Sequence, residues 1–222
     1  MDRKTIAYIA PFAAFLVFTG LTQWLETAHV MPFGFAARYT LFPLQTVVCA
    51  GVLAYFWRQY RVRMPAKAWI AAAIGTLVFA LWVSPQVVFH QAPRLDGFDP
   101  GTFAGKTGLY WGEVVMRFAR LVVVVPALEE IFWRGWLLRF VINEEFEAVP
   151  FGTCTWRANG IVAVGFMLEH SMADWPAALA TGLLYNLVAY RTRSLSSCIL
   201  AHALTNGLLG AYIMVTHQWG FW

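Results

Sequence analysis

Long apolar segments are the feature of this 222-residue chain that most restricts its fold. A helix needs about 20 largely apolar residues to cross a bilayer. Pro126 lies inside one of these segments and could divide it into two helices, because proline removes a backbone donor. The segments lie at residues 5–25, 39–57, 68–89, 113–139, 159–172, 175–190 and 195–216. We therefore predict an all-α, polytopic transmembrane bundle of seven to eight helices, forming a single integral membrane domain over residues 1–222.

The composition excludes an ordinary soluble enzyme. Hydrophobic residues make up 59% of the chain and charged residues only 13%, whereas a soluble domain carries about 25% charged residues. Cys49, Cys154 and Cys198 lie far apart without CxxC spacing, which indicates neither a disulfide framework nor a thiolate metal site. The net charge of +4 comes from basic residues beside apolar segments, where charges that orient a membrane protein belong. We expect a lipid bilayer as partner, and no nucleic acid.

Loop charges predict an orientation. With the N-terminus in the cytoplasm, eleven Lys and Arg residues fall on the inner side and five on the outer side. We therefore expect an integral protein of the bacterial inner (plasma) membrane with a cytoplasmic N-terminus. Residues 58–67 and 191–193 would face the cytoplasm. Counted from that side, Glu129, His170 and His202 lie roughly 10 to 16 Å deep, and we expect a cavity holding them to open there.

Ionisable residues inside apolar segments are the strongest indication of function. A charge near the bilayer centre costs about 2.5 to 3.5 kcal/mol even on the mildest scale, so it needs a partner or water. The i, i+4 spacing stacks Glu130 over Arg134, and likewise His202 over Asn206. The residues that stand out are Glu129, Glu130, Arg134, Phe166, Glu169, His170, His202 and Asn206. Three helices would thus bring a carboxylate and two imidazoles to a similar depth.

Such a cluster can activate water, but simpler explanations exist for several members. A carboxylate and an imidazole can share the protons of a water that attacks a carbonyl, while nearby donors stabilise the oxyanion. Glu130 with Arg134 could equally be a structural salt bridge, and Glu169 could be a second buried polar group near the outer rim. Arg117 and Arg120, one turn apart, are expected at the membrane interface, reaching outward along their aliphatic stems.

The order of these residues resembles the CPBP family of intramembrane proteases, also called the Abi or type II CAAX prenyl endopeptidase family. Its pattern is EExxxR, then FxxxH, then HxxxN. The chain has Glu129-Glu130-xxx-Arg134, Phe166-xxx-His170 and His202-xxx-Asn206, all intact and in order. The resemblance covers about residues 113–210, which would form the catalytic core. The sequence segment that begins at Glu129 also resembles that of a bacterial subgroup of CAAX prenyl protease-related proteins, which are often linked to exosortase protein sorting.

The resemblance implies a glutamate-type, metal-independent endopeptidase without a cofactor. The residue matching Glu129 would activate water together with the one matching His170. The oxyanion would be stabilised by His202 and Asn206. The supporting residues would be Glu130, Arg134 and Phe166. The eukaryotic relatives remove the last three residues of prenylated proteins. The expected partner is a peptide or lipidated protein at the membrane, and neither the natural substrate nor the oligomeric state follows from the sequence.

Two other classes of protein remain open at this point. A zinc protease would use Glu129, His170 and His202 as ligands, since one carboxylate and two imidazoles suit a catalytic zinc with an open position. A proton-coupled transporter or a non-catalytic scaffold would also bury carboxylates and histidines. Neither needs an asparagine one turn after the second histidine.

Overall fold

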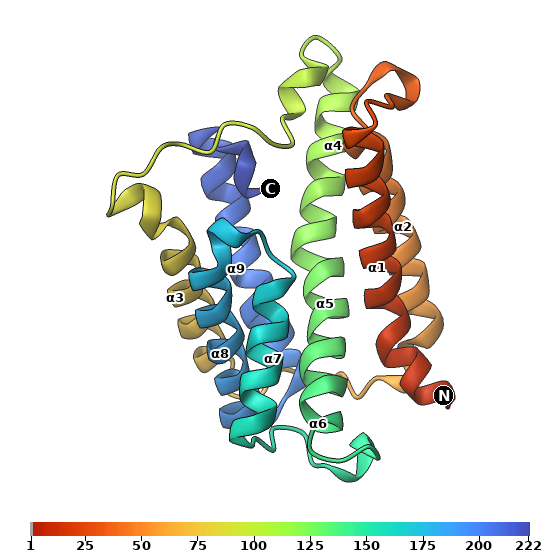
Figure 1. The fold of residues 1–222 in the computed structure, drawn as a ribbon, viewed down its shortest axis with the longest axis vertical. Coiled ribbons are helices and arrows are strands. Elements are labelled where there is room, and N and C mark those ends of the chain that lie inside the picture. Colours follow the sequence, from red (N-terminus) through yellow and green to blue (C-terminus); the bar gives the residue numbers. More distant parts are fainter. Residues whose placement is uncertain (1) are drawn as a thin grey trace.

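The chain folds into an all-α bundle whose helices run roughly along one direction (Figure 1). The computed structural model describes residues 2–222, and no strand forms within them. The helices are α1 (Arg3–Thr27), α2 (Arg38–Phe56), α3 (Ala68–Val87), α4 (Thr107–Phe118), α5 (Val125–Glu130), α6 (Leu138–Phe140), α7 (Trp156–Leu168), α8 (Trp175–Thr192) and α9 (Leu195–Thr216). Each apolar segment predicted from the sequence coincides with one of them, except the fourth, which covers most of α4 to α6.

Helices α4, α5 and α6 form one continuous helix that crosses the middle of the bundle. Two π-helical segments, Ala119–Val124 and Ile131–Leu137, join them. Pro126 lies two residues after the end of the first π segment, and the helix continues through it. The chain is therefore not divided at Pro126. Single π turns inside α-helices are rare and often mark functional positions.

Four helical segments are long and apolar enough to cross a membrane, in agreement with an integral membrane protein. They are Arg3–Thr27, Arg38–Gln59, Ala68–Val87 and Leu195–Thr216. Helix α7 has 13 residues and so measures about 20 Å, which is less than the hydrocarbon thickness. That seven to eight helices span the bilayer stays a prediction.

The bundle has two distinct ends, which we call lower and upper as drawn in Figure 1. The lower end holds the connections 57–67, 141–155 and 193–194. The upper end holds the connections 28–37, 88–106 and 169–174, together with residues 217–222. Of the 16 Lys and Arg residues, ten lie at the lower end and three at the upper end, and the other three are buried between them.

Close helix contacts place the elements that carry the polar residues. Helix α9 packs against α3 so tightly that a Cβ on Gly75 would lie 2.5 Å from the carbonyl oxygen of Ala201. The Thr205 hydroxyl donates to the Gly75 carbonyl oxygen at 2.8 Å in the same contact. On the other side, a Cβ on Gly182 would lie 2.9 Å from the Cα of Ala163, so α8 also lies close to α7. Small residues at these contacts let the helix backbones approach, as is common in membranes.

Candidate active site

One cavity of about 370 Å³ holds most of the residues that the sequence singles out. It is lined by Glu129, Phe166, His170, His202 and Asn206, which come from α5, α7 with the turn after it, and α9. The structure therefore brings all five together. The other two predicted site residues, Glu130 and Arg134, lie behind this wall and do not line the cavity.

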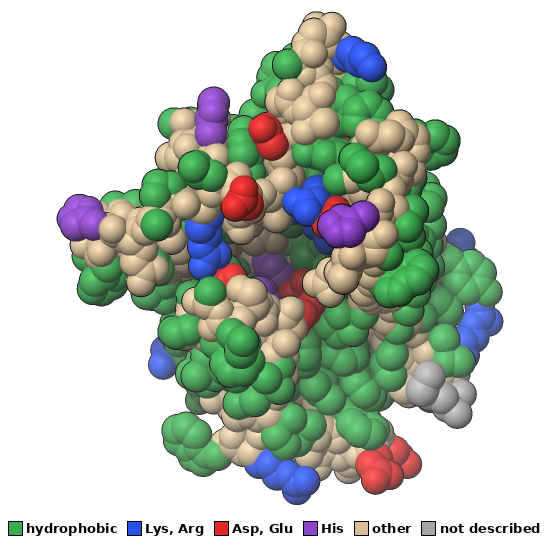
Figure 2. Space-filling model, turned by 45° about the horizontal axis from the view of Figure 1, so that its top comes forward, with side chains coloured by type: hydrophobic (Ala, Val, Ile, Leu, Met, Phe, Trp, Pro, Cys, Tyr) green, Lys and Arg blue, Asp and Glu red, His purple; other side chains and the backbone are tan. Residues whose placement is uncertain are grey.

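The cavity opens at the upper end of the bundle. Its wall includes Arg94, Asp174 and Gly220, which belong to that end. Figure 2, in which the upper end is turned forward, shows a hollow with histidine and acidic side chains at its bottom. The expectation that it opens beside residues 58–67 and 191–193 is wrong. Depth along each helix correctly indicates that the polar residues lie near the middle of the bundle. It does not indicate which end is open. The lower side is closed by buried side chains around Arg134, and this closure depends on contacts between helices.

The predicted pair of Glu130 and Arg134 forms the centre of this closing layer. Both side chains are fully buried, and Arg134 Nη1 donates to Glu130 Oε1 at 3.0 Å. Arg134 also donates from Nε to the Asn186 side-chain oxygen and from Nη2 to the Gly182 carbonyl oxygen, each at 3.0 Å. A charge desolvated this completely is tolerated only because each nitrogen finds an acceptor.

Asn186, on α8, is a supporting residue that the sequence did not reveal. Its amide nitrogen donates to the side-chain oxygen of Asn159 at 2.8 Å, so the hydrogen bonds of Arg134 extend into α7. The Arg134 guanidinium also lies over the rings of Phe166 and Tyr185, 5.2 and 5.4 Å from their centroids. Phe166 therefore offers the arginine a flat aromatic surface.

His202 is fixed by Glu130. The Nδ1 atom of His202 lies 3.0 Å from Glu130 Oε1, the oxygen that also accepts from Arg134. Because an ionised carboxylate can only accept, Nδ1 carries a hydrogen, and Nε2 is the atom free to act in the cavity. The ring packs against Tyr185, whose hydroxyl donates to Thr205 at 2.7 Å.

His170 is oriented by the end of its own helix. Helix α7 stops at Leu168, and His170 Nδ1 lies 2.8 Å from the carbonyl oxygen of Phe166. A carbonyl only accepts, so Nδ1 carries the hydrogen and Nε2 of the neutral ring has the free lone pair. The ring is held between Trp82 and Phe166, with centroid separations of 5.4 and 4.9 Å. The lone pair of His170 Nε2 is thus available to accept a proton.

Two carboxyl groups share the bottom of the cavity. Glu129 is 5% exposed, and its Oε2 is buried without a hydrogen-bond partner. Glu169 lines the same cavity, also has a buried Oε2 without a partner, and lies close enough to Glu129 for their charges to interact. Two close, buried carboxylates repel each other strongly, which favours a shared proton. The sequence singled out Glu169 as a possible second buried polar group, and the structure places it in the cavity wall.

The arrangement does not match the zinc site considered above. Within residues 2–222, no group of three or more His, Cys, Asp or Glu side chains is arranged to hold a metal ion. Glu129, His170 and His202 line one cavity but do not form such a group.

Arg117 and Arg120 are not at the interface, so that expectation is wrong. They are 3% and 7% exposed and both line the cavity above Glu129. Aromatic rings from distant parts of the chain cover them: the Arg117 guanidinium lies 4.7 Å from the centroid of Phe42 and 5.1 Å from that of Phe98. The arginine side chains therefore contact aromatic rings inside the protein and do not extend to the membrane interface.

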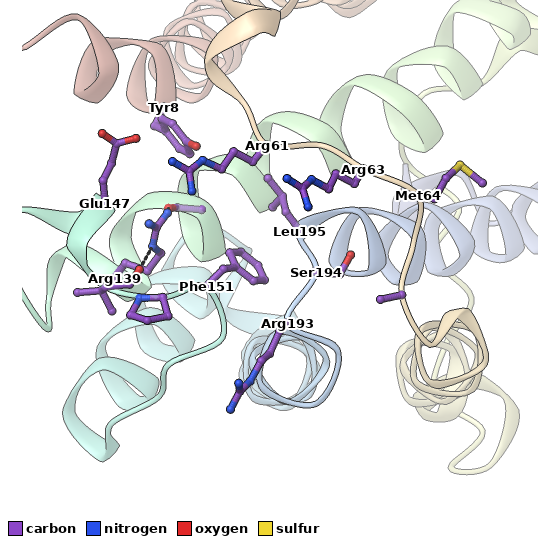
Figure 3. Close-up of a pocket in the computed structure, with 14 residues that line it drawn as sticks. Tyr8, Arg61, Arg63, Met64, Arg139, Glu147, Phe151, Arg193, Ser194 and Leu195 are labelled. Carbon is purple, nitrogen blue, oxygen red and sulfur yellow. Dashed lines mark hydrogen bonds between the residues drawn. The ribbon is translucent and has the colours of Figure 1, made fainter.

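A second cavity, of about 430 Å³, lies at the lower end (Figure 3). Four arginines line it, and Figure 3 shows Arg61 and Arg63 side by side above Arg139. It contains none of the predicted site residues. The lining arginines are Arg61, Arg63, Arg139 and Arg193. Its lining carboxylate, Glu147, is paired with Lys4, and the arginines add to the positive charge of the lower end.

Comparison with known proteins agrees with the motifs. Residues 111–208 match the family model described as Type II CAAX prenyl endopeptidase Rce1-like. The match includes all three motifs and excludes α1, α2 and α3. Neither the curated proteins nor the solved structures gave a match. The resemblance drawn from the motifs is confirmed, and it implies a peptide hydrolase. Over residues 111–208, the chain is similar to the Rce1-like type II CAAX prenyl endopeptidases.

Proposed function

We propose that the chain is an intramembrane endopeptidase that uses Glu129 and His170 to activate water. The observation that carries the proposal is the cavity in which a carboxyl group without a partner and an imidazole with a free Nε2 meet. A water between them loses a proton to this pair as its oxygen attacks a peptide carbonyl carbon. Residues 113–210 form the catalytic core, within a single membrane domain.

His202 and Asn206 stabilise the oxyanion that forms in this step. His202 donates from Nε2 in the form of its ring that carries both protons, while Nδ1 is held by Glu130. The Asn206 amide supplies a second donor from the same face of α9. When the tetrahedral intermediate collapses, the C–N bond breaks and the leaving amine takes the proton held by Glu129. Glu169 beside it provides a second site for that proton.

Glu130 and Arg134 act as positioning residues. Glu130 holds His202, and Arg134 holds Glu130, with Phe166 as the surface on which the guanidinium lies. No atom of the reacting peptide needs to touch either charge. Their burial closes the site to the lower end, so water and substrate enter from above.

The side on which substrate enters follows from the charge asymmetry. Ten basic residues at the lower end against three at the upper end favour a cytoplasmic lower end and N-terminus. The cavity then opens on the outer face of the bacterial inner membrane. We propose a substrate that is a membrane-associated polypeptide presented on that outer face.

The decisive experiment is to identify cleaved peptides in cells and then with purified protein. We expect membrane-peptide termini that disappear when Glu129→Gln replaces the wild-type copy. With a peptide identified in this way, Glu129→Gln should lower turnover by roughly 10² to 10⁴ while its melting temperature stays near that of the wild type. Glu144→Gln, an exposed carboxyl in the 141–155 connection, is the matched control and should keep full activity. Full activity of purified Glu129→Gln would reject the proposed base.

A further inference from the structure

Four arginines converge on the cavity at the lower end of the bundle, which we call the lower cavity (Figure 3). They are Arg61, Arg63, Arg139 and Arg193. Within residues 2–222, none of them forms an ion pair with a carboxylate. Glu147 is the carboxylate in the wall, and it is paired with Lys4 at 2.5 Å. The lower cavity therefore combines four positive charges with no unpaired carboxylate in its wall.

The fold fixes the backbone from which these arginine side chains extend. The Arg63 N–H donates to the Ser196 hydroxyl oxygen at 3.0 Å. The Ser197 hydroxyl donates to the Ala66 carbonyl oxygen at 2.7 Å, which also fastens the connection before α3 to the start of α9. Arg193 directly follows α8, and its N–H closes the last turn of that helix. The positive charges are therefore held together by contacts between distant parts of the chain.

The charged ends of the side chains are free to bind a ligand. Arg139 donates from Nε and Nη1 to the carbonyl oxygens of Val149 and Gly135, at 2.8 and 3.0 Å, which leaves Nη2 for another acceptor. The other three arginines are exposed. Arg61 also lies close enough to Arg139 for their like charges to repel each other. An anion between them would remove this repulsion.

The start of α9 adds to the attraction for an anion. Ser194, which is the N-cap of α9, and Leu195 form part of the wall. The first N–H groups of a helix have no acceptor within it and carry a partial positive charge. Guanidinium groups bind phosphate through two parallel hydrogen bonds, and a phosphate group offers oxygen atoms in more than one direction. This geometry suits arginines that approach from three separate parts of the chain.

We propose that the lower cavity binds a phosphate group, at a site separate from the one that holds Glu129. The two cavities share no lining residue. The inference does not depend on the proposed peptidase activity, because it concerns binding and requires no reaction.

The level of the lower cavity favours a phospholipid as the source of the phosphate. Three apolar spans, Arg3–Thr27, Ala68–Val87 and Leu195–Thr216, start at the lower end. Trp69 and Trp156, in the first turns of α3 and α7, are exposed at the same end, and tryptophan is typical of the membrane–water interface. Phospholipid headgroups lie at this level, and basic pockets between membrane helices bind anionic headgroups.

Binding can be measured on the full chain in a neutral detergent. The probes are dioleoyl phosphatidylglycerol in mixed micelles and inorganic pyrophosphate in buffer. The test variant carries Arg61→Gln and Arg63→Gln, and the control variant carries Arg58→Gln and Arg157→Gln. The control removes the same charge from exposed positions at the same end, outside the cavity. Native mass spectrometry counts the bound lipids, and melting temperatures report binding because a ligand stabilises the folded state.

We expect the wild type and the control variant to bind phosphatidylglycerol equally, and the test variant to bind it about 25-fold more weakly. Near a membrane surface, each arginine contributes roughly fivefold to the affinity for anionic lipid, and two are removed. Without a ligand, the test variant should melt no lower than the wild type, because it loses a repulsion and no ion pair. That measurement separates loss of binding from loss of folding.

The two probes distinguish a lipid from a soluble ligand. Binding of pyrophosphate that is lost in the test variant, without binding of phosphatidylglycerol, would support the phosphate site and assign it to a soluble ligand. Sodium chloride at equal ionic strength is the comparison for pyrophosphate. Equal affinities of the wild type and the test variant for both probes would overturn the proposal. The same loss of affinity in the control variant would also overturn it, since the arginines would then act only through the overall charge of the lower end.

Discussion

Asn206 donates a hydrogen bond from its side-chain amide to the backbone carbonyl oxygen of Leu121 at 2.8 Å. Leu121 lies in the first π segment, where the Val125 N–H reaches back to the Arg120 carbonyl. The same register would pair Leu121 with the N–H of residue 126, but Pro126 has none. Asn206 therefore replaces a missing backbone donor and ties α9 to the helix that carries Glu129.

Replacing Asn206 by alanine should affect both stability and catalysis. The Leu121 carbonyl would remain buried without a donor, which costs about 1 to 3 kcal/mol of unfolding free energy. Loss of the oxyanion donor should separately lower turnover by roughly 10² to 10³. Denaturant unfolding in detergent and steady-state kinetics measure the two effects.

Pro126→Ala separates these two roles of Asn206. An alanine at position 126 supplies the absent N–H, so the double variant Pro126→Ala, Asn206→Ala should recover much of the lost stability while its turnover stays low. If the double variant is no more stable than Asn206→Ala, the amide does not substitute for the proline donor.

Removing Arg134 should destabilise the protein strongly. In Arg134→Met, Glu130 stays buried beside His202 without its cation, a change that commonly costs about 3 to 5 kcal/mol. Adding Glu130→Gln removes the stranded charge and should restore part of the stability but not the activity, because His202 loses its anionic partner. Melting temperatures in detergent give the comparison, with the exposed Arg157→Met as control. An unchanged melting temperature in Arg134→Met would contradict the buried network.

Local sequence patterns predicted the helices and the internal pairs but not the shape of the cavity. The i, i+4 spacing placed Glu130 against Arg134 correctly, because that contact lies within one helix turn. The partners of Arg117 come from α2 and the 88–106 connection, so its burial depends on tertiary contacts that no local pattern contains. Asn186 was missed for the same reason. The catalytic roles of the motif residues stay predictions.

Surface labelling should show that the two ends of the bundle lie on opposite sides of the membrane. Cys154, exposed at the lower end, should react only after permeabilisation, whereas a cysteine in place of Leu95 at the upper end should react from outside. Partial burial raises the pKa of the Cys154 thiol, so less thiolate is present at neutral pH and its labelling should be faster at higher pH. Cys49 and Cys198 are buried and should not react with the label. Labelling of Cys154 in intact cells would reverse the orientation and place the cavity on the cytoplasmic face.

Activity should survive prolonged chelation. In the proposed mechanism the proton leaves water for Glu129 and His170, and no metal ion takes part in the step. A zinc enzyme would instead lose its metal to a strong chelator and regain activity when zinc is added. Elemental analysis of wild type, His170→Ala and His202→Ala should therefore find no stoichiometric zinc in any of them. One zinc per wild-type chain that is lost in both variants, with chelator-sensitive activity restored by zinc, would replace this mechanism by a metal-dependent one. Asn206→Ala also distinguishes the two mechanisms. An asparagine amide is a poor zinc ligand, so this variant should have little effect on turnover in a zinc enzyme. A large decrease in turnover is expected only if Asn206 stabilises the oxyanion.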